Sequence, residues 1–307
     1  MTIEYRLKRL ESELTNVNAT KELPANPIDF ARSIGLIPDE WQEKLLNQLA
    51  ESTKENKPMR ALCNTSRQSG KSTIVALCVV FTLLTRPNST VAILSPTQRQ
   101  SSITFRRCLQ IWRASGKIVP EAAQSALQLK LQNGSWLVAL PSNEEGVRGL
   151  TCNLLAIDEA ARVSRDLYIA CLPFLSTIHD SKLLIMSTPA GAGTNWFYEE
   201  WTKGVNWTRY TVTADEVSRI KKADLEDFRS KLPEAKFQQE FYCKFLDSDS
   251  AVFDSNVIKR QIRDYPTLDS LIDNAIDGAE FGEEAEESED SELFVDELNI
   301  FSDSNSN

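Results

Sequence analysis

The chain has 307 residues, 41% of them hydrophobic, and a formal net charge of −10. This length and apolar content suffice for one large domain or two modest ones. No apolar run is long enough to span a membrane, and the first residues do not form a signal peptide. Six scattered cysteines without a C-x-x-C pair, and a single histidine, argue against a disulfide framework and against a histidine-based zinc site.

The negative charge is concentrated at the end of the chain. Residues 247–307 hold 18 acidic residues against 3 basic ones, a net −15, so the first 246 residues carry +5. A mildly basic body is compatible with a nucleic-acid partner. We expect residues 255–307 to form an acidic and largely disordered tail.

The N-terminal part is predicted to lead into a strand. A charged amphipathic helix is expected at Tyr5–Leu14, and Pro24 and Pro27 indicate a linker, so residues 1–37 are assigned to an N-terminal helix and linker. A helix over 39–51 follows, and residues 59–64 have the pattern of a short buried strand.

The segment after that strand, Thr65–Thr73, has the composition of a phosphate-binding loop. It reads T-S-R-Q-S-G-K-S-T, and an apolar helix pattern follows at 74–84. A loop between a strand and a helix places unpaired N–H groups and the positive end of the helix dipole at an anion. Lys71 is suited to neutralise the β- and γ-phosphates, and the Ser72 hydroxyl to bind Mg²⁺. The first glycine of the usual G-x-x-x-x-G-K-[ST] pattern is replaced by Thr65, and Arg67 adds a second positive charge.

The next elements are a strand at 90–94, a helix at 97–115 and a hairpin. The helix carries Arg99, Arg106, Arg107 and Arg113, which are either a solvated face or contacts to DNA phosphates. Residues 127–131 and 136–140 alternate across Asn133-Gly134, which is typical of a hairpin turn.

A second acidic motif follows at Leu154–Glu159, where an apolar strand ends in two adjacent carboxylates. In α/β folds ligands bind at the carboxyl ends of buried parallel strands. Asp158 is then a candidate Mg²⁺ ligand and Glu159 a candidate for orienting the attacking water. The alternative is a strand that ends in a solvated turn.

The remaining elements complete an α/β pattern. A helix near 166–178 precedes an apolar strand at 182–186, which runs into Ser187, Thr188 and Pro189, residues that can sense the γ-phosphate. A strand at 207–212 and helices at 223–231 and 234–244 follow. Alternating strands and helices predict a mostly parallel central sheet flanked by helices. Together with the phosphate-binding loop and the acidic strand, this pattern indicates a P-loop NTPase fold of the ASCE/RecA-like kind.

In this order the motifs resemble the ATPase domain of the terminase large subunit of tailed phages, over about residues 38–254. The resemblance implies an adenine contact by Trp41 and Gln42, and an arginine finger at Arg148 within Gly146-Val-Arg-Gly149. It also implies a coupling role for Ser187, Thr188 and Pro189. The nucleotide-binding loop residues it implies are Arg67, Gln68, Ser69, Gly70, Lys71, Ser72 and Thr73.

The resemblance further implies a Mg²⁺-dependent ATPase that packages double-stranded DNA into a procapsid in the host cytoplasm. Its expected partners are a homo-oligomeric ring on the phage portal and the terminase small subunit. Either a separate nuclease polypeptide supplies the cutting activity, or this protein does not cut. We expect no nuclease activity from this chain, because no strand-borne carboxylate cluster is visible after Asp254. The alternatives are a helicase-like ATPase and a nucleotide-binding regulatory subunit.

Overall fold

The computed structural model describes residues 24–117, 127–140, 142, 147, 149–191 and 195–246. Three sequence predictions therefore lie outside the described residues: the helix at Tyr5–Leu14, the arginine-finger candidate Arg148, and the acidic tail at 255–307.

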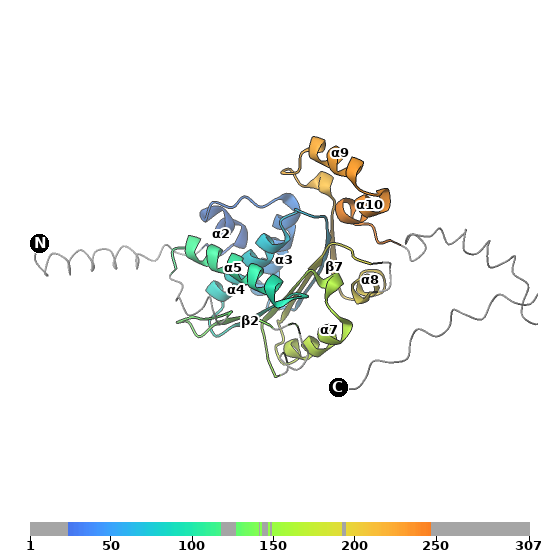
Figure 1. Ribbon diagram of the computed structural model, residues 1–307. Helices are drawn as coiled ribbons and strands as arrows, with labels where there is room; N and C mark the ends of the chain where they lie inside the picture. Colours follow the sequence, from blue (N-terminus) through green and yellow to red (C-terminus); the bar gives the residue numbers. More distant parts are fainter. Residues whose placement is uncertain are drawn as a thin grey trace, which may run out of the picture. The chain divides into compact units, whose positions relative to one another are not determined.

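A seven-stranded sheet forms the centre of the described region (Figure 1). Its strand order is β3-β4-β2-β5-β6-β1-β7, and every neighbouring pair is parallel except β3 and β4, the predicted hairpin. This confirms the predicted fold class. The strands are β1 Met59–Thr65, β2 Thr90–Leu94, β3 Gln128–Lys130, β4 Trp136–Ala139, β5 Leu154–Asp158, β6 Lys182–Ser187 and β7 Thr208–Val212.

Helices cover both faces of the sheet (Figure 1). Helices α2 to α5 lie on one face, and α7 and α8 lie on the other. The α-helices are α2 Pro27–Ser33, α3 Glu40–Lys54, α4 Lys71–Thr85, α5 Gln98–Ala114, α7 Arg165–Cys171, α8 Trp196–Thr202, α9 Lys222–Lys231 and α10 Glu234–Tyr242.

Side-chain alternation along the strands explains the two layers. In β1, Ala61 and Cys63 face α2–α5, whereas Leu62 between them faces α7 and α8. Successive side chains of a strand point to opposite faces, so a strand that is apolar throughout is buried on both sides. All residues of β5 and of β6 are buried, as the apolar runs at 154–157 and 183–186 predict, and the polar residues Asp158, Lys182 and Ser187 at the strand ends are buried with them.

Three segments differ from the sequence predictions. The predicted linker contains α2, and its Phe30 is buried in the core with 1% of its surface exposed. The helix predicted at 166–178 ends at Cys171, where a 3₁₀ turn, Leu172–Leu175, takes over around Pro173. Helix α8 was not predicted.

The remaining sequence-based expectations concern cysteines and membranes. All six cysteines are free and buried, so they act as small core residues. Among the described residues, no helix combines the length and the apolar character that a membrane crossing requires.

Candidate active site: a phosphate loop facing an acidic strand end

The loop between β1 and α4 has the backbone geometry of an anion cradle. Gln68 and Gly70 have positive φ values of 59° and 90°, which turn the chain into the N-terminus of α4. The φ of 90° at Gly70 is one that other residues rarely adopt, and a Cβ atom there would also displace the end of the Gln42 side chain, whose Nε2 lies 2.7 Å from its position. Thr65 is the last residue of β1 and does not have a positive φ, which explains why the usual first glycine is not needed here.

Lys71 is a buried cation at the start of α4. Its Nζ donates hydrogen bonds to the Ser66 carbonyl oxygen at 3.0 Å and to Thr188 Oγ1 at 2.9 Å. Burial lowers the pKa of Lys71, while the carboxylates of Glu159 and Asp158 act in the opposite direction. A desolvated ammonium that faces the end of β6 is well placed to bind an anion.

Asp158 lies at the end of β5 and accepts hydrogen bonds from two hydroxyl groups. Ser72 Oγ donates to Asp158 Oδ2 at 3.1 Å, and Thr104 Oγ1 of α5 donates to the same oxygen at 3.0 Å. Burial raises the pKa of this carboxyl group. A single carboxylate beside a serine hydroxyl fits Mg²⁺, which usually binds one or two carboxylates and completes its shell with water and substrate phosphates. The described residues contain no cluster of three or more acidic, His or Cys ligands.

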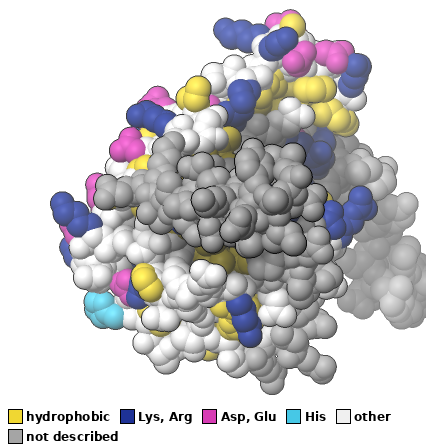
Figure 2. Space-filling view, turned by 90° about the vertical axis from the view of Figure 1, so that its left-hand side faces the viewer, with side chains coloured by type: hydrophobic (Ala, Val, Ile, Leu, Met, Phe, Trp, Pro, Cys, Tyr) yellow, Lys and Arg dark blue, Asp and Glu magenta, His cyan; other side chains and the backbone are white. Residues whose placement is uncertain are grey.

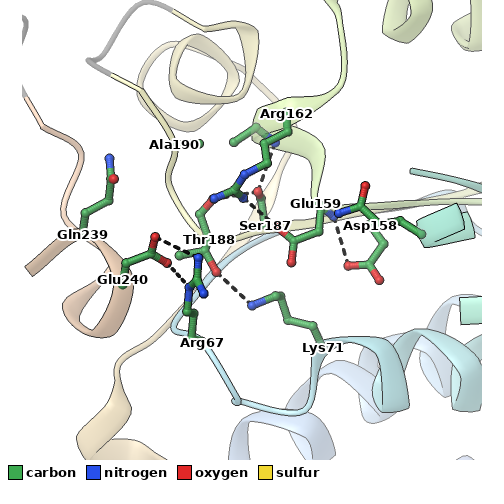
Figure 3. Close-up of polar contacts among 12 residues, drawn as sticks. Arg67, Lys71, Asp158, Glu159, Arg162, Ser187, Thr188, Ala190, Gln239 and Glu240 are labelled. Atoms are coloured by element: carbon green, nitrogen blue, oxygen red, sulfur yellow. Dashed lines mark hydrogen bonds and ion pairs between the residues drawn. The ribbon is translucent and has the colours of Figure 1, made fainter. Parts of the chain in front are cut away.

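Glu159 begins the turn after β5 in a left-handed conformation, with φ 54° and ψ 41°. Non-glycine residues in this region are uncommon, and such strain is concentrated at functional sites. The Glu159 carboxylate forms an ion pair with Arg162, with 2.7 Å between Oε2 and Nη1 (Figure 3). Arg162 was not predicted from the sequence, although its position three residues after Glu159 allows the contact.

Lys71, Ser72 and Glu159 line one open cleft of about 570 Å³ at the carboxyl ends of β1, β5 and β6, and Asp158 is connected to it by the hydrogen bond from Ser72. The cleft therefore brings together the predicted phosphate-binding loop, the acidic end of β5 and Thr188 from the segment after β6. It also contains Gln100 and Arg107 of α5, which the sequence analysis did not assign to the site. The lining residues are Arg67, Gln68, Gly70, Lys71, Ser72, Thr73, Gln100, Arg107, Glu159, Arg162 and Thr188.

Four other predicted site residues do not line the cleft: Trp41, Gln42, Ser69 and Ser187. Trp41 packs in the core and Gln42 caps α3, where its Oε1 accepts from the Asp39 N–H at 2.9 Å; neither lines the cleft. An adenine contact by these two residues stays a prediction. Ser69 donates to the Ser66 carbonyl at 2.9 Å and is buried. Ser187 accepts from the Ala161 N–H at 3.0 Å, and it joins the turn after β5 to the end of β6.

Arg67 connects the loop to α10. Its guanidinium forms an ion pair with Glu240, and its backbone N–H donates to the Glu240 carbonyl at 2.9 Å (Figure 3). The Glu240 side chain is only 3% exposed and also pairs with Lys236 at 2.8 Å. The extra arginine predicted to face the phosphates is thus shared, in this structure, with a helix 173 residues away in the sequence.

This ion-pair cluster predicts a pH-dependent stability. Burial alone would raise the pKa of Glu240, but hydrogen bonds from Arg67 and Lys236 outweigh it, so the pKa lies below its ordinary value. A depressed folded-state pKa gives stability that is present above the unfolded-state pKa of about 4.3 and lost as pH falls through the folded value. We expect the Glu240→Gln variant to be less stable than wild type at pH 7, and the difference to shrink below about pH 4. Urea unfolding across pH measures this difference in the free energy of unfolding.

Glu226→Gln, which removes an exposed carboxylate of α9, is the control. A difference between wild type and Glu240→Gln that is equal at every pH would contradict the lowered pKa of Glu240.

The comparison with known proteins identifies the family. Residues 62–260 match the family described as "Terminase large subunit, T4likevirus-type, N-terminal". The chain belongs to this family. Curated relatives include the terminase large subunits of Thermus virus P23-45 and Thermus phage G20c, each 25% identical over 224 residues. These alignments cover 61% of this chain and 46% of each relative, so the chain spans about half the length of the curated relatives it matches.

Solved structures of other terminases share the fold. The ATPase domain of the Thermus phage P74-26 large terminase superposes with a TM-score of 0.60 at 24% identity, covering 71% of this chain and 98% of that domain. The large terminase of a thermophilic bacteriophage, solved in complex with ADP, gives a TM-score of 0.59 at 16% identity, covering 68% of this chain and 53% of that protein.

Proposed function

We propose that this chain is a Mg²⁺-dependent ATPase whose hydrolysis cycle drives translocation of double-stranded viral DNA. The observation that carries the proposal is the meeting of Lys71, Ser72, Asp158, Glu159 and Thr188 in one site. These residues come from three separate strand ends, and each has the chemistry that phosphoryl transfer needs. Membership of the terminase family, and the ADP complex of the large terminase from a thermophilic bacteriophage, support ATP as the nucleotide.

In this proposal each residue has a separate task. Lys71 and the N–H groups at the start of α4 bind the β- and γ-phosphates. Ser72 and Asp158 hold the Mg²⁺ ion, which would neutralise charge on the phosphate oxygens. Glu159 orients and polarises the attacking water. Thr188, hydrogen-bonded to Lys71, is placed to transmit the loss of the γ-phosphate into β6 and, through Ser187, into the turn after β5.

The wider assembly is part of the same proposal. A homo-oligomeric ring on a portal and a terminase small subunit are the partners that the family suggests. Domain limits of 38–254 for the ATPase unit and 255–307 for the acidic tail are likewise proposed. Because α2 packs on the core, we extend the packed unit upstream to Pro27.

Phosphate release from ATP, measured with purified protein with and without duplex DNA, tests the function. We expect release that requires Mg²⁺ and rises when DNA assembles the subunits. Nucleotide binding without release at any protein or DNA concentration would instead support a regulatory, non-motor subunit. Release that is strong but indifferent to duplex DNA would contradict the translocation part of the proposal.

A further inference from the structure

Positive charge is unevenly distributed over the described residues. Between positions 86 and 142 the described residues include seven Lys and Arg and no Asp or Glu. Elsewhere in the described chain, 19 basic residues are balanced by 19 acidic ones. The net positive charge of the described region therefore comes from one segment, which comprises β2, α5 and the β3–β4 hairpin at one edge of the sheet. Its cations are Arg86, Arg99, Arg106, Arg107, Arg113, Lys117 and Lys130.

Helix α5 presents three of these arginines in a line. Arg99, Arg106 and Arg113 are exposed and lie seven residues apart, which is nearly two full helical turns. They therefore form a stripe about 21 Å long, with a rise of about 10.5 Å between neighbours. The opposite face of the helix is fixed in the core between α5, α4 and the sheet, where its apolar residues are buried: Phe105, Cys108, Leu109, Ile111 and Trp112.

Nothing among the described residues neutralises this stripe. None of its three arginines forms a salt bridge to a described carboxylate, in contrast to Arg86, which pairs with Asp180. Arg99 even occupies the first turn of α5, where the helix dipole disfavours a cation and no acidic residue compensates. The arrangement is thus not explained by helix stability. Helix α9, by comparison, carries both signs interspersed, as the top of Figure 2 shows.

We propose that the stripe of Arg99, Arg106 and Arg113 on α5 is a contact surface for the phosphate backbone of duplex DNA. The duplex carries one negative charge per about 1.7 Å of axis, so a stripe of about 21 Å can follow its backbone over roughly six base pairs. Ile103, 52% exposed between the first two arginines, can pack on the sugar edge. The choice of DNA as the polyanion rests on the proposed function.

The surface is directly connected to the candidate active site. Thr104 of the same helix donates to Asp158, and Gln100 and Arg107 line the nucleotide cleft. A displacement of α5 by bound DNA would therefore reach the proposed Mg²⁺ ligand through one hydrogen bond. DNA is accordingly expected to alter ATP turnover through this helix.

The test compares two triple variants of the full chain with the same change in charge. The first is Arg99→Gln/Arg106→Gln/Arg113→Gln. The control is Lys203→Gln/Lys221→Gln/Lys222→Gln, three exposed cations outside α5 that form no salt bridge to a described residue. Binding to a labelled duplex is measured across a salt series, together with basal ATP hydrolysis and mass in solution.

We expect the α5 variant to bind duplex DNA about tenfold or more weakly at low salt, with a salt slope smaller by about 2.7, since each phosphate contact contributes about 0.9. Its basal hydrolysis should remain at the wild-type level, while stimulation by DNA is lost. Equal weakening of DNA binding in the two triple variants would overturn the inference. A change in the mass of the α5 variant in solution, without a change in its DNA binding, would also overturn it, because the stripe would then be a contact between copies of the chain. A wild-type protein that binds DNA through α5 but releases no phosphate would contradict the proposed function alone.

Discussion

The Glu159→Gln variant is expected to bind Mg·ATP and to lose turnover by about 10²- to 10⁴-fold, the usual contribution of a positioned general base. Glutamine preserves the size of the side chain but cannot accept a proton from water. Its neutral amide also ends the ion pair with Arg162, so nucleotide affinity is measured separately from turnover. Wild-type turnover in this variant would remove Glu159 from the catalytic role.

Lys71→Ala is expected to fail at an earlier step. Loss of the ammonium removes charge-assisted hydrogen bonds to phosphate oxygens, each worth about 1.5–3 kcal/mol, so affinity for nucleotide should fall by about 10- to 100-fold. The fold should persist, because burying the ammonium costs free energy and its hydrogen-bond partners in this structure are only a carbonyl and a hydroxyl group. Equilibrium binding of a fluorescent nucleotide analogue separates the two variants. Glu226→Gln on the exposed face of α9 should behave as wild type in both assays.

The sheet and the phosphate loop were predictable because their signals are local. A strand buried on both faces is largely an apolar run, as in residues 154–157 of β5 and 183–186 of β6, and the turn at Asn133-Gly134 follows an alternating segment at 127–131. The loop motif was predictable because it lies directly between a strand pattern and a helix pattern in the sequence, which is the order that a phosphate-binding loop has. The parallel strand ends then bring Asp158 and Ser187 to the same edge as Thr65.

Helix α8 lacks such a local signal. Its buried residues, Trp196 and Phe197, are adjacent and do not show helical spacing. The helix is stabilised from outside the segment, because the Trp196 ring stacks on Tyr168 with centroids 3.9 Å apart, and its indole N–H donates to the Val163 carbonyl at 2.7 Å. Tertiary packing of this kind has no counterpart in the sequence of the segment.

The contacts that connect the site to the rest of the fold were equally unpredictable. Glu240 reaches Arg67 across 173 positions, and Thr188 reaches Lys71 across 117. Each pair consists of ordinary polar residues whose roles appear only when the chain is folded. Trp41 is a core residue with 6% exposure, and its adenine contact stays a prediction.

Arg148→Ala is expected to reduce ATP turnover by about 10³- to 10⁵-fold, the range for a well-placed arginine finger. We propose that this arginine acts on the nucleotide of a neighbouring subunit.

Mixing experiments distinguish this proposal from a finger within the same chain. Arg148→Ala subunits keep an intact Glu159, and Glu159→Gln subunits keep an intact Arg148, so an interface between them can combine both groups and recover part of the activity. The rival is Arg107, which lines the cleft and, among the described residues, forms no salt bridge. Two results together would show that the finger belongs to the same chain. Arg107→Ala would lose turnover on the same scale, and Arg148→Ala would either keep its turnover or recover no activity when it is mixed with Glu159→Gln subunits.

Two of the three arginines that line the cleft are already held by carboxylates. Because Arg67 and Arg162 each hold a glutamate in this structure, either would have to give up an ion pair to reach the phosphates. Arg107 is the one arginine among the described lining residues that has no salt bridge to give up, so the comparison of Arg107→Ala with Arg148→Ala decides whether the charge comes from the same chain or from a neighbouring subunit.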